Sequence, residues 1–484
     1  MRTIDSAKKW PGFSKLLCEV NGASPSWSST AKKVVVATLK EQYSSLDLDL
    51  PKGFESLESS KVTTVTTGHQ LQLFGGPAFL HYKTITAIRK ARELSSTDNP
   101  VVPVFWMASE DHDFEEISWV YGQTAKHHWI KDSGSKMVGN LSLDGLLEVF
   151  GSWIGDGDHA HEEIREILQL SIDRDECYGN FFIRLMHLWY GDTGLVVIDA
   201  SHKNLKNIFA QEMRNELNGD GISSYVLDGN IKPREINLFH SPPKGPRVGV
   251  IPSDKGPVSN GELVSGESPE KLSPSVLLRP MYQEKLLPNS HVILGPSEIK
   301  YWQQLTPAFE KLEINMPTLY LRDHVLVLEK TDLELFERLG WSVTQGWWSK
   351  DDFVRRIIDG ELARRFNLKL EDLHNDEELL RVLEEFQIEF GSEMNSAEAH
   401  ARVKNKIRKT AIKKVKRHLK ELTSKEIYVL STALSKVMNG RIPQDRWGNF
   451  HVLSRSVGGF RNLRDKLLET TDAEGPVMQV IVAD

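Results

Sequence analysis

Residues 61–94 read KVTTVTTGHQLQLFGGPAFLHYKTITAIRKAREL, and this stretch decides the fold. The β-branched run at 62–67 favours a strand, because branched side chains fit the pleated surface of a sheet. Gly75 and Gly76 predict a loop, and Pro77 suits the first turn of a helix, where a missing N–H costs little. Apolar residues then recur every three or four positions, as in an amphipathic helix. The stretch therefore predicts a strand, a glycine-rich loop and a helix.

The glycine-rich loop is a candidate anion site. The first amide groups of a helix lack partners within the helix and can bind a phosphate or a carboxylate. The loop matches neither the Walker pattern nor Gly-x-Gly-x-x-Gly, so it does not predict a lysine-cradled triphosphate. The alternative for Lys83 is a solvated position on an exposed helix face. The residues that we assign to this anion site are Gly68, His69, Gln70, Gly75, Gly76, Pro77 and Lys83.

A second predicted strand ends in a dense polar cluster. Residues 101–109 are nearly all apolar, as in a strand buried on both faces of a parallel sheet. The cluster EDHDFEE follows at the carboxyl end, where open α/β sheets bind ligands. Carboxylates beside an imidazole can bind an amine or move its proton. We therefore predict catalytic roles for Asp111, His112 and Asp113, and a binding role for Glu110.

The same cluster has two other interpretations. An acidic strand end can simply cap the following helix. A metal site would need a second histidine at a recognised spacing, which the cluster lacks, so the sequence predicts no metal.

Two further strand-to-helix units complete the predicted core. GLVVIDA at 194–200 and HVILG at 291–295 are short apolar strands, each followed by a helical pattern. Such alternation predicts a doubly wound α/β core. Arg279 stands among apolar residues, where a charge is costly unless paired, so we expect it to meet a carboxylate of the ligand or of the protein. Arg279, Gln283, Gly295 and Glu298 are predicted to complete the pocket.

The chain is long enough, at 484 residues, for more than one structural unit. Ten acidic side chains within 371–398 precede ten basic ones within 402–420, and the basic segment has apolar residues at helical spacing. Such helices can pair within one chain or across a dimer. The predicted parts are an N-terminal segment of the core (1–60), a Rossmann-like core (61–345) with insertions near 120–190 and 216–275, a helical coiled-coil domain (351–440), and a tail (441–484) that returns to the core.

Composition restricts the possible functions. The chain is 39% hydrophobic and 26% charged, which is ordinary for a globular protein, and no apolar run approaches a membrane span. The N-terminus lacks a signal-peptide core, and Cys18 and Cys177 cannot form a disulfide framework, so we predict a cytoplasmic protein without a membrane partner. The net charge of −7 argues against nucleic acid as a partner, and the basic helix is interpreted as a solvated face.

Five ordered motifs resemble the cysteine ligases of bacillithiol biosynthesis, the BshC family. They are TTGHQLQLFGGPAFLHYK, VPVFWMASEDHDFEEI, LVVIDA, SVLLRPMYQEKLLP and LGPSEIKYW, spread from about residue 60 to 330. The acidic and basic helices resemble the family's coiled-coil dimerisation region. This chain departs from the family pattern at His69, where many members have glutamine, and at Ser109, where Gly or Thr is expected. Beyond Pro443-Gln444-Asp445-Arg446 the tail matches poorly.

The resemblance implies a fold and an activity. The fold would be a Rossmann-like core related to class I aminoacyl-tRNA synthetases and nucleotidyltransferases, with a homodimer formed through the coiled coil. The activity would be the addition of L-cysteine to the glucosamine amine of glucosaminyl-malate, which forms bacillithiol. A synthetase-like core implies ATP and a cysteinyl adenylate, but no KMSKS-like loop is present, so the nucleotide requirement stays open.

Two rival functions remain at this point. One is a nucleotidyltransferase-like enzyme for another small metabolite, since the fold does not name the acceptor. The other is a non-catalytic scaffold or RNA-binding protein with a degenerate synthetase core, which would bind through the basic helix in a salt-sensitive way.

Overall fold

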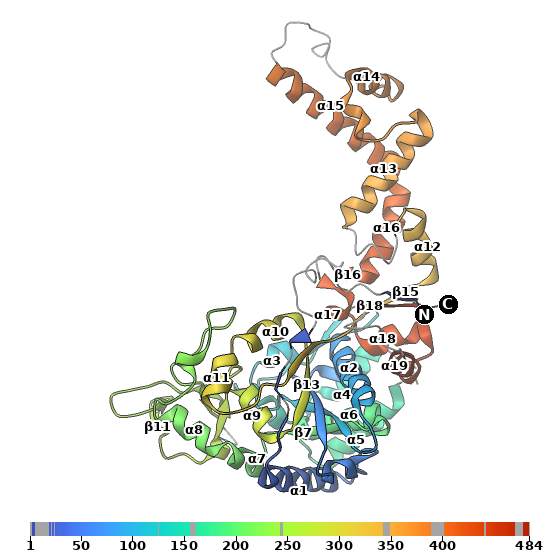
Figure 1. Ribbon diagram of the computed structural model, residues 1–484. Helices are drawn as coiled ribbons and strands as arrows, with labels where there is room; N and C mark the ends of the chain where they lie inside the picture. The colour runs from blue at the N-terminus through green and yellow to red at the C-terminus, as the bar shows by residue number, and fades with distance from the viewer. Residues whose placement is uncertain are drawn as a thin grey trace. The chain divides into compact units, whose positions relative to one another are not determined.

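The computed structural model describes residues 2–4, 19–20, 22–23, 25–123, 125–154, 161–242, 245–341, 349–388, 401–439, 442–469 and 478–483. The chain forms two compact units (Figure 1). The larger unit contains Lys15–Val325 and Asp445–Gln479, and the smaller unit contains Met1–Ser14, Leu326–Gln444 and Val480–Asp484. Among the described residues, no helix combines the length and the apolar character that crossing a membrane requires.

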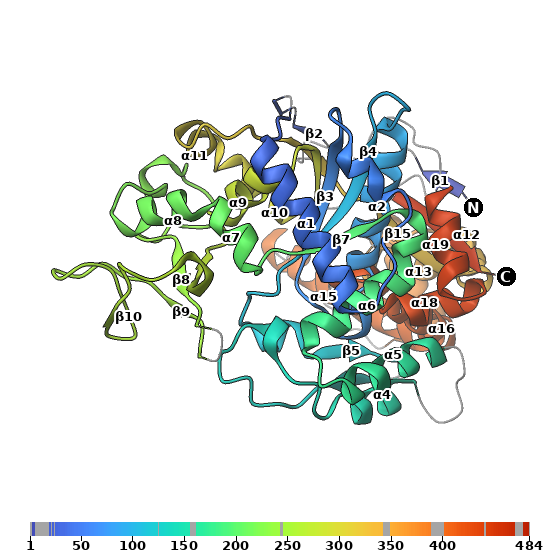
Figure 2. The ribbon, with the colours of Figure 1, turned by 90° about the horizontal axis from the view of Figure 1, so that it is seen from below.

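A sheet with five parallel strands forms the centre of the larger unit (Figure 2). Its strand order is β2-β14-β13-β3-β4-β7, in which the edge strand β2 runs antiparallel to β14. The order reverses beside β3, because the chain first adds β4 and β7 on one side and later β13 and β14 on the other. Ligands bind at such a switch point, outside the carboxyl ends of the strands. The strands are β2 (Glu19–Val20), β3 (Thr63–His69), β4 (Val101–Met107), β7 (Val196–Asp199), β13 (Asn289–Leu294) and β14 (Thr318–Leu321).

Helices cover both faces of this sheet. On one face, Ala87 and Ala91 of α2 pack against Val65 of β3. On the other face, the ring of Trp106 in β4 meets Tyr282 of α9 edge-on. The predicted α/β core with a parallel sheet is therefore confirmed. The helices of this unit include α1 (Ser29–Ser45), α2 (Phe79–Leu94), α3 (Phe114–Ile117), α7 (Lys203–Ile208), α8 (Ala210–Leu217), α9 (Arg279–Leu286), α10 (Pro296–Gln303) and α11 (Thr306–Lys311).

The segment predicted as a first insertion contains a hairpin and three helices. Its members are β5 (Trp119–Tyr121), β6 (Lys126–His128), α4 (Leu146–Ile154), α5 (Glu162–Asp173) and α6 (Tyr178–Tyr190). Residues 155–160 of this segment lie outside the described residues. The last helix, α6, belongs to the core packing, because Phe182 contacts Phe105 of β4 at a centroid distance of 6.0 Å.

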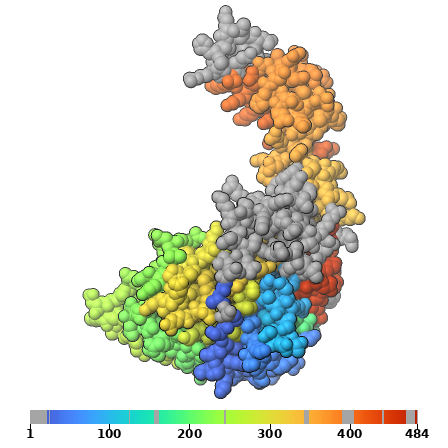
Figure 3. Space-filling view, viewed as in Figure 1, coloured from blue at the N-terminus to red at the C-terminus, as the bar shows by residue number. Residues whose placement is uncertain are grey.

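The segment predicted as a second, loop-dominated insertion contains a three-stranded antiparallel sheet in the order β12-β8-β9. Strands of two or three residues are too short to show the alternation that predicts a strand. The segment is green in Figure 3 and forms one continuous surface with the yellow segments that follow it. Its strands are β8 (Leu238–His240), β9 (Val248–Gly249), β10 (Val258–Ser259), β11 (Glu262–Leu263) and β12 (Leu272–Pro274).

The smaller unit is largely helical, as predicted. The acidic and basic helices α14 and α15 pack together within one chain, and Arg408 Nε donates to Asp376 Oδ1 over 2.7 Å. No coiled coil is seen among the described residues, and Glu389, Glu393 and Glu398 of the acidic segment lie outside them. The helices are α12 (Lys330–Arg338), α13 (Lys350–Phe366), α14 (Asp376–Glu385), α15 (Ala401–Leu422) and α16 (Ser424–Val437).

The strands outside the central sheet include the C-terminal segment MQVIVA. It forms β18 (Met478–Ala483) between β1 (Arg2–Ile4) and β15 (His324–Glu329). A separate hairpin is made by β16 (Met438–Asn439) and β17 (Ile442–Pro443).

The chain returns to the larger unit at Asp445. The returning segment contains α17 (Gln444–Trp447), α18 (Phe450–Ser454) and α19 (Phe460–Leu468). Arg464 of α19 is buried and donates to both carboxylate oxygens of Asp192 over 2.8 and 2.9 Å. Residues far apart in the sequence therefore build one core.

Candidate functional site

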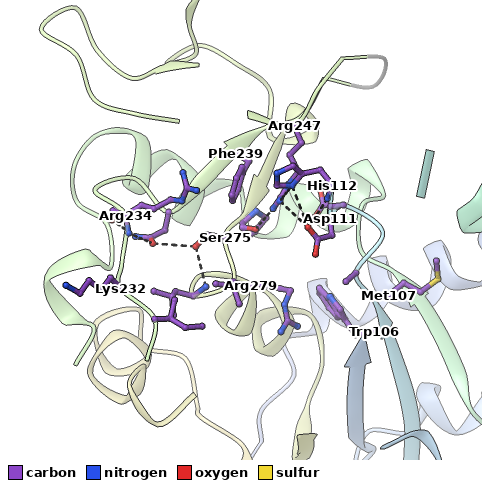
Figure 4. Close-up of a pocket in the computed structure, with 17 residues that line it drawn as sticks. Trp106, Met107, Asp111, His112, Lys232, Arg234, Phe239, Arg247, Ser275 and Arg279 are labelled. Carbon is purple, nitrogen blue, oxygen red and sulfur yellow. Dashed lines mark hydrogen bonds and ion pairs between the residues drawn. The ribbon is translucent and has the colours of Figure 1, made fainter. Parts of the chain in front are cut away.

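Two adjoining cavities lie at the carboxyl ends of the parallel strands. We call the first the insertion cavity, because the small β12-β8-β9 sheet forms part of its wall (Figure 4); its volume is about 420 Å³. We call the second the switch-point cavity, because it lies between the ends of β3 and β13; its volume is about 500 Å³. The residues common to both are Trp106, Ala108, Asp111, Val276 and Arg279.

Asp111 stands where the two cavities join. Its Oδ2 accepts a hydrogen bond from Gln70 Nε2 over 2.7 Å, and its Oδ1 accepts one from the His112 backbone N–H over 2.8 Å. Burial acts to raise the pKa of Asp111, but the Gln70 hydrogen bond and the charge of Arg247 outweigh it, so the pKa is lowered. Asp111 is therefore a carboxylate at neutral pH.

His112 lines the insertion cavity beside Asp111. Its Nδ1 lies 3.0 Å from Arg247 Nη1. Burial and the neighbouring charge of Arg247 lower the pKa of His112, so its ring is neutral at pH 7. Arg247 comes from the second insertion, and the sequence offered no spacing that would place it here.

The other two acidic residues of the cluster differ in position. Glu110 lines the insertion cavity, and its Oε1 lies 2.5 Å from Nζ of Lys206. Asp113 is exposed, accepts a hydrogen bond from the Glu116 backbone N–H over 3.3 Å at the start of α3, and lines neither cavity. Helix capping, the alternative noted from the sequence, is the contact that Asp113 makes.

Lys83 and Glu298 form an ion pair at the switch-point cavity, in which the lysine is buried and the glutamate is partly exposed. Lys83 Nζ lies 2.8 Å from Glu298 Oε2 and also donates to the Gly68 carbonyl over 2.7 Å. The Gly295 backbone N–H donates to the same Oε2 over 2.7 Å. The Lys83 side chain is 1% exposed, so its interpretation as a solvated surface lysine is wrong.

The pKa values of Lys83 and Glu298 are both shifted from their usual values, for different reasons. Burial lowers the pKa of Lys83 although Glu298 opposes the shift. Burial alone would raise the pKa of Glu298, but the charge of Lys83 outweighs it and lowers the value. His69 lines the same cavity, and burial together with the charge of Lys83 lowers its pKa to about 4. His69 is therefore neutral at pH 7.

Arg279 lines both cavities and is a cation without an acidic partner among the described residues. Its Nη2 donates to Tyr301 Oη over 3.2 Å, and it makes no ion pair within the described part of the chain. The sequence predicted that Arg279 pairs with a carboxylate of the protein or of the ligand. Because no described carboxylate of the protein pairs with it, a carboxylate of the ligand is the expected partner.

Further basic side chains line the cavities, and sequence reasoning missed them. Arg322 lines the switch-point cavity and is held by Asp445, whose Oδ2 lies 2.5 Å from its Nη2. Nothing local in the sequence signals this pair, because its members are separated by 123 residues. For Lys232, Arg234 and Arg247 the only local signal is the density of basic residues in KPR at 232–234 and KGPR at 244–247. The additional residues are Arg446 in the switch-point cavity and Lys232, Arg234 and Arg247 in the insertion cavity.

The structure does not bring Gly75, Gly76 and Pro77 to either cavity. The loop is buried beneath the returning segment: the Ala78 N–H donates to the Gly448 carbonyl over 2.7 Å, and Asn449 Nδ2 donates to the Gly76 carbonyl over 3.1 Å. Gly75 has a φ of +80°, and a Cβ there would lie 2.4 Å from His81 Nε2. Because glycine has no side chain, the loop can pack tightly against α2 and against the returning segment.

Gln283 is also absent from both cavity walls. It is buried and donates to Glu284 Oε1 over 2.9 Å. Of the remaining predicted residues, Gly68, Gln70 and Gly295 do line the switch-point cavity. Within the described ranges, no three His, Cys, Asp or Glu side chains are placed to hold a metal ion together.

Comparisons with known proteins identify relatives. A family model described as "Bacillithiol biosynthesis BshC, N-terminal Rossmann-like domain" matches residues 13–323. Three curated proteins named "Putative cysteine ligase BshC" are similar to the chain. The Flavobacterium johnsoniae protein is 31% identical over 67% of this chain and 65% of its own length. The Christiangramia forsetii protein is 29% identical over 72% and 70%, and the Flavobacterium psychrophilum protein is 33% identical over 62% and 61%.

The chain thus spans about two thirds of the length of these relatives. Among solved structures, Thermus thermophilus arginyl-tRNA synthetase aligns over 91% of this chain and 85% of its own, with 10% identity and a TM-score of 0.25. That score is too low to support a common fold, so the relation to class I synthetases stays a prediction.

Proposed function

Since the chain belongs to the BshC family of bacillithiol biosynthesis, we propose that it is a cysteine ligase, the activity for which its relatives are named. The reaction would join the carboxyl group of L-cysteine to the glucosamine amine of glucosaminyl-malate by an amide bond. The matched residues 13–323 contain the central sheet and most of both cavity walls. The observation that carries the proposal is that an ionised Asp111 and an available Arg279 both line the place where the two cavities join.

Asp111 suits the amine of the sugar substrate. A carboxylate kept ionised by Gln70 and Arg247 attracts an ammonium group and accepts its hydrogen bonds. Because its pKa is lowered, Asp111 is better suited to bind and orient the amine than to accept the amine's proton as a general base. Asp111 would therefore hold the nitrogen in line, and once the ammonium group has released a proton to solvent the neutral amine would attack the cysteine carbonyl carbon.

The malate carboxylates would bind to the basic side chains of the cavities. Arg279 makes no ion pair in the described part of the chain, and Lys232 and Arg234 lie on the far wall of the insertion cavity (Figure 4). Guanidinium groups bind carboxylates with two parallel hydrogen bonds. We therefore assign anion binding to these basic side chains and no longer to the glycine-rich loop.

ATP remains a proposed co-substrate. A free carboxyl group does not form an amide without activation, and ATP supplies that activation when it binds. The switch-point cavity fits a phosphate, because Arg279, Arg322 and Arg446 line it and α10 begins at its edge. The homodimer formed through a coiled coil and the cytoplasmic location likewise stay predictions from the sequence.

Replacing Asp111 by asparagine tests the proposed role of the carboxylate. The purified protein would receive cysteine, glucosaminyl-malate and ATP, and mass spectrometry would follow the thiol product. Asp111→Asn keeps the side-chain shape but loses the charge that holds the amine, so turnover is expected to fall at least about 100-fold.

The matched control is Asp113→Asn, an exposed position that lines neither cavity, which is expected to retain turnover. Unchanged turnover in Asp111→Asn would remove the assigned role. A wild-type protein that makes no product with or without ATP would overturn the proposed function itself.

A further inference from the structure

Arg247 is fixed from several sides inside the second insertion. It is buried, its Nε donates to Ser273 Oγ over 2.9 Å, and its Nη2 donates to the Pro274 carbonyl over 3.3 Å. Its guanidinium carbon lies 3.7 Å from the centre of the Phe239 ring (Figure 4). A group held in this way points its remaining N–H bonds in one direction, and that direction is toward His112.

The contact between Arg247 and His112 determines which ring nitrogen carries the proton. An arginine side chain has only donors, so Nδ1 of His112, at 3.0 Å from Nη1, must accept. In a neutral ring the proton then resides on Nε2. Asp111 is the competing group, since its Oδ1 lies 3.6 Å from Nδ1 and would favour a proton there. That oxygen already accepts the His112 backbone N–H over 2.8 Å.

The other ring nitrogen faces no protein partner. Nε2 of His112 has no hydrogen bond within the described ranges, and the side chain is 36% exposed and lines the insertion cavity. The charged groups around the ring are Asp111, Asp113, Arg234 and Arg247. An N–H that is available in a basic cavity suits an oxygen acceptor, such as a carbonyl or carboxylate oxygen.

We propose that Arg247 is a positioning residue that holds His112 as its Nε2–H tautomer, so that His112 donates a hydrogen bond to a substrate oxygen. This differs from the proton-accepting role that the sequence indicated for His112. The assignment of the oxygen to the carbonyl or carboxylate of the reacting substrates rests on the proposed ligase function, whereas the tautomer does not. A donor at this place would stabilise negative charge that develops on the carbonyl oxygen during amide formation.

Nitrogen-15 NMR of histidine-labelled full-length protein measures the tautomer directly. The His112 signals would be identified by their loss in His112→Gln. At pH 7.5 the wild type is expected to show a protonated Nε2 and an unprotonated Nδ1. A protonated Nδ1, or a doubly protonated ring, would overturn the proposal without any further variant.

Two variants then distinguish the effect of Arg247 from that of Arg234, which packs on the same Phe239 ring. Arg247→Met removes the donor and is expected to move the proton toward Nδ1 and Asp111, and to lower kcat at least about 10-fold. Arg234 also lies over Phe239, at 4.7 Å, but no hydrogen bond from it to His112 Nδ1 is seen among the described residues, so Arg234→Met is expected to leave the proton on Nε2 although it removes a charge near the ring. An unchanged spectrum in Arg247→Met would contradict the positioning role.

The measurements also separate this inference from the proposed function. If Arg247→Met does not fold, Arg247→Lys retains the buried charge, and partial loss of the Nε2–H tautomer is expected because an ammonium cannot make all of the contacts of the guanidinium. A wild type with the expected tautomer that makes no bacillithiol would leave the positioning role intact and would reject the ligase assignment.

Discussion

Replacing Lys83 by methionine is expected to lower the free energy of unfolding by about 3 to 5 kcal/mol, because breaking a buried ion pair leaves an uncompensated charge. The Lys83 side chain is 1% exposed and that of Glu298 is 27% exposed, and Nζ also binds the Gly68 carbonyl at the end of β3. The loss would be measured by urea denaturation followed by circular dichroism at pH 7.

Two control variants show whether the pair itself is responsible. Lys83→Met combined with Glu298→Gln is expected to recover part of the loss, since no unpaired charge then remains. Lys40→Met removes an ion pair of similar length, 2.7 Å, in which both side chains are about half exposed, and little change is expected. Equal destabilisation by Lys83→Met and Lys40→Met would contradict the importance of burial.

The free energy of unfolding is also expected to fall as pH rises from 5 to 9 because of Glu284. Burial raises the pKa of this carboxyl to about 8 from a usual value of 4.5, against hydrogen bonds from Gln283 and Asn289. The folded protein therefore holds a proton that the unfolded chain releases. The stabilisation is complete below pH 4.5 and is lost as pH rises through 8, with a total on the order of 3 to 5 kcal/mol.

Glu284→Gln isolates this contribution, because an amide stays neutral at every pH and has nearly the same shape. Urea denaturation of both proteins at several pH values between 5 and 9 gives the comparison. The difference between the two curves is expected to grow in favour of the variant from pH 5 to about pH 8, and to level off above the pKa of the folded protein. Parallel curves would mean that Glu284 is not a buried protonated group.

Local sequence predicted the framework of the site. The strand expected at 62–67 is observed at Thr63–His69, because its β-branched side chains fit the pleated surface of a buried sheet. The rule that ligands bind at the carboxyl ends of parallel strands then placed Asp111 and Glu298 at the cavities. Both results depend on short stretches of chain.

Distant contacts explain what the sequence did not predict. The loop at Gly75 and Gly76 has the local pattern of an anion site, but Gly448 and Asn449 cover it from the far end of the chain. Arg247 reaches His112 across 135 residues, through a sheet whose strands have no periodicity of their own. No spacing within a motif contains such information.

The order in which the larger unit is completed has a consequence for its synthesis on the ribosome. Residues 326–444 separate the fifth parallel strand from Asp445, which is the carboxylate partner of buried Arg322. During translation Arg322 therefore lacks its partner until residues 326–444 have been made. An incomplete nascent chain carries an unpaired arginine at the switch-point cavity and an uncovered glycine loop. Premature termination thus leaves both the binding site and the core unfinished, and exposes the truncated product to proteolysis.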